Sequence, residues 1–241
     1  MEFIKVKNYQ EMSDQACNIM IDKINQIEQP VLGLATGSTP EGLYQNLIEK
    51  YNQGQVSFKH VTTFNLDEYV GLDREDVNSY YRYMKEKLFN HIDIAMERVH
   101  LPNGTAHDLE AECQHYEKQI QQAGKIDLQI LGMGINGHIG FNEPGTSFHS
   151  STHIVDLAPS TREANSRFFP SIDDVPTQAL TMGIETIMES KEVLLLVSGK
   201  QKAEAIARLA EGEISEDFPA SILRNHPNVT VIVDEGAMAK L

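Results

Sequence analysis

The chain has 241 residues, 41% hydrophobic and 23% charged, which is typical of a globular protein with one α/β domain. Its formal net charge of −15 excludes a long phosphate-tracking groove, so we expect no nucleic-acid partner and no membrane partner. The sequence shows no export signal and no apolar run that could cross a bilayer, and its two cysteines suit a reducing compartment, so we expect a cytoplasmic protein.

Several segments carry apolar residues at helical spacing, and short continuous apolar runs separate them. In chain order, these patterns predict a helix over 12–27, a strand over 31–36, a helix over 43–48, a strand over 60–66 and helices over 78–91 and 108–121. The second half adds strands over 126–133, 192–198 and 228–234, with a helix over 203–210. Since no repeat or linker interrupts this alternation, residues 1–241 are expected to form a single domain.

The predicted strands are apolar throughout, a pattern typical of a parallel sheet buried on both faces. Together with the intervening helices, they predict an α/β, Rossmann-like fold: a mainly parallel sheet with helices on both faces. Ligands of such sheets bind at the carboxyl ends of the strands, so we expect the functional loops to follow residues 36, 66, 133 and 198.

A glycine-rich stretch, GMGINGHIGFNEPG, follows the predicted strand at 126–133. Gly132, Gly134 and Gly137 satisfy the G-x-G-x-x-G pattern of dinucleotide sites, and Asp156 lies about 20 residues further on, where the ribose-binding acid would stand. That motif needs a helix to begin at the glycines, but the residues that follow include Pro144 and lack helical periodicity. A nicotinamide-dependent dehydrogenase is therefore the weaker of two interpretations.

In the other interpretation, the glycines let the backbone approach a ligand while Asn136, His138 and Glu143 stand at set offsets in one loop. An imidazole beside a carboxylate can move a proton near neutral pH. The alternative, less favoured from spacing alone, is that His138 serves only to bond the backbone of a tight turn.

The stretch ATGSTPEGLY, residues 35–44, resembles an anion-binding helix start. Pro40 suits the first turn, Ser38 or Thr39 could cap the helix, and Ser38 with Glu41 fits a capping box. Free N–H groups at such a start can bind a phosphate; an ordinary capped helix would use the same residues. The candidate anion-binding residues are Thr36, Gly37, Ser38 and Thr39.

Charged side chains follow two other strands. Lys200 and Lys202 stand near a helix start in VSGKQKAEAI, which is not a Walker A loop. Asp67 and Glu68 follow the strand at 60–66; in extended backbone they point to opposite sides, which leaves open which acid faces the site. The histidines offer no metal-ligand pattern, so we expect no metal.

Taken in order, LATGSTP, FNLDEYVG, GINGHIGFNEPG, TREANSRFF and GKQKA resemble the glucosamine-6-phosphate deaminase family, from about residue 1 to the C-terminus. The resemblance implies conversion of glucosamine 6-phosphate and water to fructose 6-phosphate and ammonia, without an organic cofactor. A 6-phosphogluconolactonase-type hydrolase and a sugar-phosphate sensor without catalysis are the alternatives.

The resemblance also implies residue roles. Asp67 would be the base for enolisation, and His138 the acid and base for ring opening, assisted by Glu143. Several family members carry Asp where this chain has Asn136, whose oxygen can still accept a hydrogen bond from an imidazole N–H and orient the ring. The residues implied to bind phosphate are Ser38, Thr39, Arg167 and Lys202.

The segment 144–170 resembles the family's mobile lid. Because the chain ends at Leu241, it lacks the C-terminal extension of longer, allosterically regulated hexameric members, and we expect weak or no activation by N-acetylglucosamine 6-phosphate. Whether the protein is a monomer or a small homo-oligomer stays open at this stage.

Overall fold

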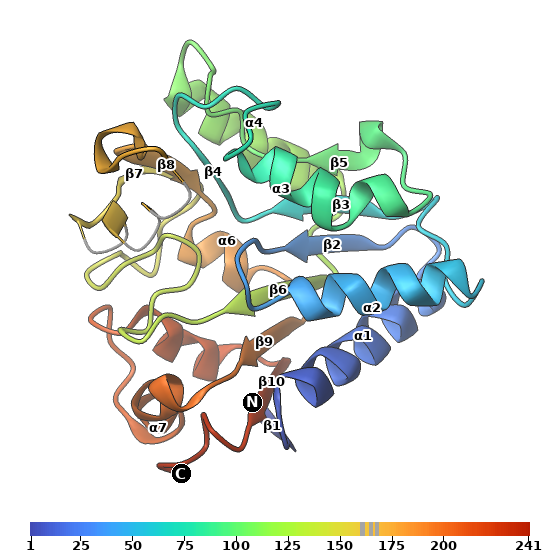
Figure 1. The fold of residues 1–241 in the computed structure, drawn as a ribbon. Coiled ribbons are helices and arrows are strands. Elements are labelled where there is room, and N and C mark those ends of the chain that lie inside the picture. Colours follow the sequence, from blue (N-terminus) through green and yellow to red (C-terminus); the bar gives the residue numbers. More distant parts are fainter. Residues whose placement is uncertain (160–161, 164–165, 167–168) are drawn as a thin grey trace.

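A mostly buried parallel sheet organises the chain in the computed structural model, which describes residues 1–159, 162–163, 166 and 169–241 (Figure 1). Its strand order is β1-β10-β9-β6-β2-β3-β5, and all neighbouring strands are parallel. The strands are β1 (Glu2–Val6), β2 (Val31–Leu34), β3 (Thr62–Asn65), β5 (Val99–His100), β6 (Leu128–Gly132), β9 (Val193–Val197) and β10 (Val229–Asp234).

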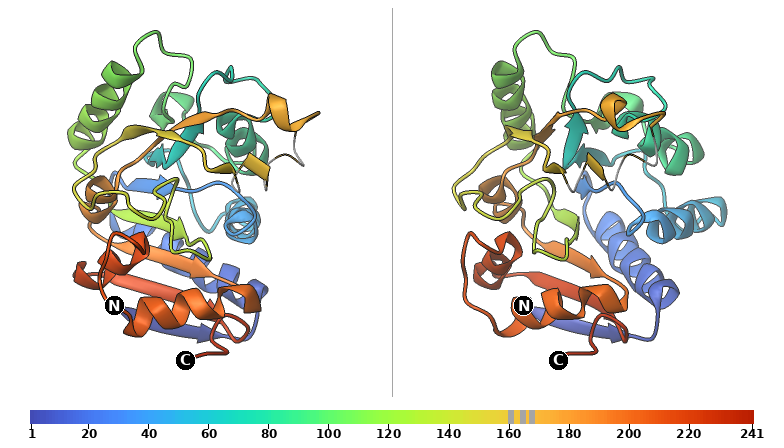
Figure 2. Two further views of the ribbon diagram at one scale, coloured as in Figure 1. Left: turned by 90° about the vertical axis from the view of Figure 1, so that its left-hand side faces the viewer. Right: turned by 60° about the vertical axis from the view of Figure 1, so that its left-hand side comes forward.

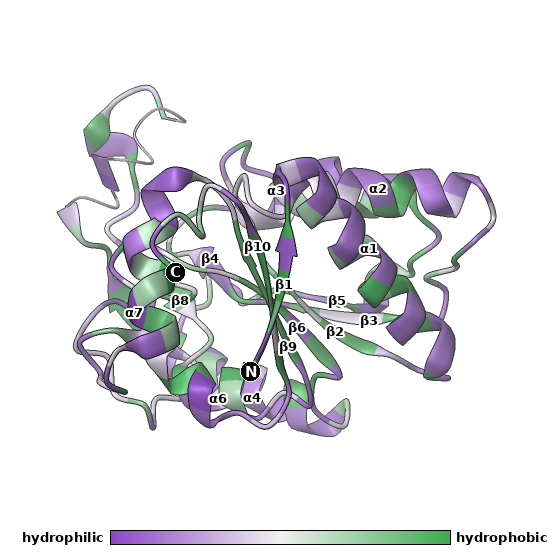
Figure 3. Cartoon of the chain, turned by 90° about the horizontal axis from the view of Figure 1, so that it is seen from below, coloured by the Kyte–Doolittle hydropathy of each residue, from purple (hydrophilic) through white to green (hydrophobic). Residues whose placement is uncertain are grey.

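Helices cover both faces of this sheet (Figure 2). One face packs against α1 (Tyr9–Gln26), α2 (Glu41–Asn52) and α3 (Tyr80–Lys87), and the other against α4 (Leu109–Gln122), α6 (Ile184–Met188) and α7 (Ala203–Glu211). Side chains alternate along each strand, so Leu32 and Leu34 enter the first cluster while Val31 enters the second. Figure 3 shows the apolar strands between more polar helices. Short 3-10 helices lie at Phe89–His91, Met96–Arg98, Ile172–Asp174, Lys200–Lys202 and Pro219–Asn225.

A small antiparallel sheet of β4 (Asp67–Tyr69), β8 (Gln178–Thr181) and β7 (His153–Asp156) lies on the side to which the carboxyl ends of β2 and β3 point (Figure 1). Leu66 joins the two sheets, because its N–H donates to the carbonyl of Leu34 and its own carbonyl accepts from Met182. The chain therefore leaves β3 at Asn65 and enters the second sheet two residues later.

The predicted α/β architecture with a mainly parallel sheet is confirmed, and the expected helices and long strands are present. The strand expected over 60–66 is present as the shorter β3, and β4, which begins at Asp67, was not expected. Strands β1 and β5 were not expected: β1 is a partly exposed edge strand, and β5 has only two residues. No helix among the described residues is long and apolar enough to cross a membrane.

Candidate active site

The two adjacent acids after β3 have different surroundings. The Glu68 carboxylate accepts hydrogen bonds from the backbone N–H groups of Tyr69, Tyr80 and Tyr81 at 2.8–2.9 Å, and so holds the first turn of α3. Asp67 lies opposite Thr181 of β8 in the small sheet and, like Glu68, is buried, with 7% of its surface exposed. The Glu68 carboxylate thus supports the fold through backbone hydrogen bonds, whereas the Asp67 carboxylate makes none with the described residues.

Burial, and to a smaller extent the nearby Glu68 carboxylate, raises the pKa of Asp67 to about 8. Among the residues that the structure describes, no hydrogen bond to Asp67 offsets the cost of removing its charge from water. A carboxylate in this state is a much stronger base than an exposed one, as proton abstraction requires.

The pKa of Asp67 makes folding stability depend on pH. The folded protein retains a proton with a pKa of about 8, whereas the unfolded chain releases it near the ordinary value of 3.8. The contribution of the protonated Asp67 to the free energy of unfolding is therefore fully present below pH 3.8 and is lost as the pH rises through about 8. Asp67→Asn cannot ionise, and we expect it to unfold at least about 2–4 °C above wild type at high pH, equivalent to about 1 kcal/mol.

Thermal denaturation at about pH 5 and about pH 8.5, with Asp22→Asn on the exposed face of α1 as control, measures this effect. The gain of Asp67→Asn should be larger at the higher pH, whereas Asp22→Asn should show no such difference. Equal gains of Asp67→Asn at the two pH values would contradict the raised pKa.

The glycine-rich loop after β6 approaches Asp67 directly. A side chain at Gly140, where φ is +58°, would place its Cβ 3.7 Å from Oδ2 of Asp67 and 3.0 Å from Oγ1 of Thr181. Gly134 leaves space for the His138 ring, since a Cβ at this position would lie 2.3 Å from the ring. These glycines make room for the approach of the loop to Asp67 and for the imidazole.

His138, Glu143 and Asn136 form one connected group in this loop. Nδ1 of His138 lies 3.6 Å from Oε1 of Glu143, and Nδ2 of Asn136 donates to Oε2 of Glu143 at 2.7 Å. The expected bond from the imidazole to Asn136 is wrong: Oδ1 of Asn136 accepts from the backbone N–H of His138 at 3.2 Å. Asn136 therefore orients Glu143, and Glu143 stands beside the ring as its acidic partner.

The geometry counts against a dinucleotide site. Residues 138–152 contain no helix, so no helix N-terminus faces the glycines. Asp156 lies in β7, where Oδ1 accepts a hydrogen bond from Gln178, rather than at the end of a strand of the parallel sheet.

The loop after β2 differs in detail from the expected capped helix. The N-cap of α2 is Pro40, with no side-chain hydrogen bond, so the capping roles expected for Ser38 and Thr39 and the capping box with Glu41 are wrong. Gly37 has φ +90° and is exposed, as is Ser38. Thr39 instead reaches the end of β6, where its Oγ1 lies 3.7 Å from the Cβ position of Gly132.

Lys202 reaches the same end of β6. Its Nζ donates to the carbonyl of Met133 at 2.7 Å, and burial lowers the pKa of the ammonium group. Within the described part of the chain, no carboxylate forms an ion pair with it. Lys200 is exposed, and Arg167 lies outside the described residues. A half-buried cation at the end of β6 provides local positive potential in an acidic protein.

Two functional contacts were missed by sequence reasoning because they depend on β8, which was not predicted. Oγ1 of Thr181 accepts from the N–H of Phe141 at 3.1 Å. Asn142 is fully buried, and its Nδ2 donates to the carbonyls of Ile139 and Met182. Both contacts hold the loop of His138 against the end of β8, which pairs with the strand β4 that carries Asp67.

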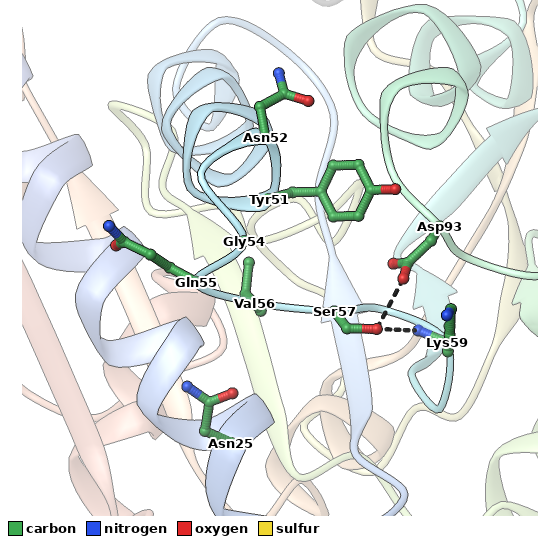
Figure 4. A pocket seen from close by; sticks show the side chains of 9 residues that line it. All are labelled: Asn25, Tyr51, Asn52, Gly54, Gln55, Val56, Ser57, Lys59 and Asp93. Carbon is green, nitrogen blue, oxygen red and sulfur yellow. Dashed lines mark hydrogen bonds between the residues drawn. The ribbon is translucent and has the colours of Figure 1, made fainter.

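A hollow of about 590 Å³ lies elsewhere, beside the last residues of α1 and α2 (Figure 4). It is polar, and Oγ of Ser57 donates to Asp93 within it at 2.8 Å. Its lining offers Lys59 and Asp93 but no imidazole or thiol, so it lacks the acid–base group found at the carboxyl ends. Across the described residues, no three His, Cys, Asp or Glu side chains are grouped as metal ligands.

Comparisons with known proteins agree with this geometry. Residues 6–232 match the family model described as glucosamine-6-phosphate isomerases/6-phosphogluconolactonase. A glucosamine-6-phosphate deaminase of Oceanobacillus iheyensis is 62% identical over 99% of this chain and 95% of its own. Glucosamine-6-phosphate deaminase 1 of Bacillus subtilis is 55% identical over 98% of both chains.

The chain belongs to the glucosamine-6-phosphate deaminase family. A solved structure of a monomeric glucosamine-6-phosphate deaminase matches it with a TM-score of 0.97 at 54% identity, over 100% of both chains. A 6-phosphogluconolactonase from Trypanosoma cruzi has a TM-score of 0.81 but only 21% identity, over 100% of this chain and 96% of that chain, which shows a shared fold alone. Family membership accounts for the joint presence of the five motifs in one chain.

Proposed function

We propose that the chain converts glucosamine 6-phosphate and water to fructose 6-phosphate and ammonia. Family membership supports this reaction, and one structural observation supports the assignment of its steps to particular residues. A buried carboxylate of raised pKa, Asp67, lies against the loop that holds an imidazole–carboxylate pair, His138 and Glu143.

The reaction requires two kinds of proton transfer. In the first, His138 takes the proton of the anomeric hydroxyl as the ring oxygen gains one, and the pyranose opens to an aldehyde. Glu143 beside the ring stabilises the imidazolium form. Asp67 then removes the C2 hydrogen, which the neighbouring carbonyl acidifies, and a proton is returned at C1. Water adds to the resulting C2 ketimine, and ammonia leaves.

The phosphate is proposed to bind where the loop after β2 meets the end of β6. Thr36, Gly37, Ser38 and Thr39 supply hydroxyl and N–H donors, and Lys202 supplies charge. Because burial disfavours the Lys202 ammonium, a bound phosphate would restore a charge partner that the described residues do not give it. Arg167 keeps its implied role as a guanidinium on the phosphate, and its position lies outside the described residues.

A comparison of two substrates tests the proposal. Purified protein is given glucosamine 6-phosphate in one assay and 6-phosphogluconolactone in another, with fructose 6-phosphate and acid release as the respective readouts. We expect turnover of the amino sugar and only the spontaneous rate with the lactone. The opposite pattern would favour the hydrolase alternative, and tight binding of both without turnover would favour a sensor.

Three further features belong to the same proposal. Residues 1–241 would form a single domain, in which the segment 144–170 acts as a lid. Gly145 lies near the start of this segment, and the segment contains β7, which pairs with β8 outside it. The monomeric solved relative supports a monomer, which light scattering of the purified protein tests. A cytoplasmic location suits Cys17 and Cys113, which are both free thiols.

A further inference from the structure

The loop after β2 is held from outside by two tyrosines that come from different helices. Oη of Tyr83, from α3, donates to the carbonyl of Gly37 at 2.7 Å. Oη of Tyr9, the first residue of α1, donates to the carbonyl of Ser38 at 2.9 Å and accepts from the N–H of Gly42 at 2.8 Å. Two successive peptide carbonyls of one exposed loop are thus bonded to helices on the same face of the large sheet.

These bonds determine where the N–H groups of the same peptides point. Both peptides are trans, and in a trans peptide the C=O and N–H point in opposite directions. With the carbonyls of Gly37 and Ser38 turned toward α3 and α1, the N–H groups of Ser38 and Thr39 point away from those helices. Among the described residues, neither N–H has a hydrogen-bond acceptor.

We propose that Tyr9 and Tyr83 are positioning residues that orient the backbone N–H groups of Ser38 and Thr39 toward the phosphate of the substrate. This inference rests on the proposed function, because it assumes that the loop binds a phosphosugar. The loop needs such support: Gly37 has φ +90° and the N-cap residue of α2, Pro40, makes no side-chain hydrogen bond, so no side chain of the loop itself holds these peptides. Burial raises the pKa of Tyr83, so its hydroxyl keeps the proton that it donates.

The same arrangement connects the phosphate loop to the proposed base. Helix α3, which carries Tyr83, begins where the Glu68 carboxylate accepts from the N–H groups of Tyr80 and Tyr81. Because Glu68 follows Asp67 directly in β4, α3 sets the position of Gly37 relative to Asp67. The tyrosine hydroxyls would thus keep the phosphate at a constant distance from the group that removes the C2 proton.

Removing one hydroxyl while keeping the ring tests the proposal. We expect Tyr83→Phe and Tyr9→Phe each to raise KM for glucosamine 6-phosphate about three- to tenfold, with kcat within about twofold of wild type. The double variant should raise KM about 10- to 100-fold, if the two bonds contribute independently. Calorimetry with inorganic phosphate should show its Kd rising by the same factors, since the affected N–H groups contact the phosphate alone.

Tyr81→Phe is the matched control, since Tyr81 lies in the same helix but its ring faces Arg74 and Lys85 and its hydroxyl bonds nothing among the described residues. It should change KM and the phosphate Kd by no more than about twofold. Thermal unfolding of all variants establishes that each is folded.

The outcomes separate the inference from the function on which it rests. Unchanged KM and phosphate Kd in folded Tyr9→Phe and Tyr83→Phe, with an active wild type, would overturn the inference and leave the reaction intact. A fall in kcat at constant KM would overturn it too. If wild type makes no fructose 6-phosphate but the phosphate Kd still rises in both variants, the proposed reaction fails and the positioning of the loop stands.

Discussion

Asp67→Asn is expected to reduce kcat for fructose 6-phosphate formation by about 10²–10⁴-fold. The amide has nearly the shape of the carboxylate but cannot accept the C2 proton. It also avoids placing a charge in a position that is 7% exposed, so the variant should fold normally. Kd for fructose 6-phosphate, measured by calorimetry, should change little, because the proposed phosphate contacts lie in other loops.

The control for this prediction is Asp22→Asn, the same chemical change on the surface of α1, which should leave kcat unchanged. An active Asp67→Asn would remove Asp67 from the role of base. A folded variant that no longer binds fructose 6-phosphate would show that Asp67 contributes to binding instead of proton transfer.

His138→Gln is expected to lower kcat by a comparable factor of about 10²–10⁴, because Gln can hydrogen-bond but cannot carry a proton between the anomeric hydroxyl and the ring oxygen. Glu143 would remain in place through its bond from Asn136, so the phosphate contacts should be retained. Steady-state rates and calorimetry on the same preparation measure both quantities.

His149→Gln provides the comparison, since the His149 side chain is 89% exposed and its nearest acid is Glu185. Its kcat should equal that of wild type. If His138→Gln and His149→Gln were equally active, the imidazole beside Glu143 would have no part in ring opening.

The sequence predicted elements where a strong period or a continuous apolar run extended over many residues. Helix α4 was expected over 108–121 and spans Leu109–Gln122, and β6 falls within the expected 126–133. The small sheet was not foreseen, because its strands have three or four residues and β7 is partly exposed along its length. These strands are formed by pairing with one another, which no local pattern encodes.

The site was predicted to the level of its loops and only partly to the level of its contacts. Alternation along the chain placed Asp67 and Glu68 on opposite sides, but only the packing of α3 on Glu68 identifies the acid that supports the fold. Ser38 fits the pattern of a cap, yet its carbonyl is held by Tyr9, 29 residues away. Asn136 could have bonded either the imidazole of His138 or the carboxylate of Glu143. Its side chain bonds the carboxylate, and this choice depends on the folded shape of the loop, which the sequence pattern does not encode.

The measurement that tests the central claim most directly is the yield of ammonia and of fructose 6-phosphate from glucosamine 6-phosphate with purified wild-type protein. A site that both isomerises and deaminates the sugar should release the two products in equal amounts, and at a rate that Asp67→Asn lowers about 10²–10⁴-fold. A phosphorylated ketose formed without ammonia, or no product from a folded protein that binds fructose 6-phosphate, would contradict the account.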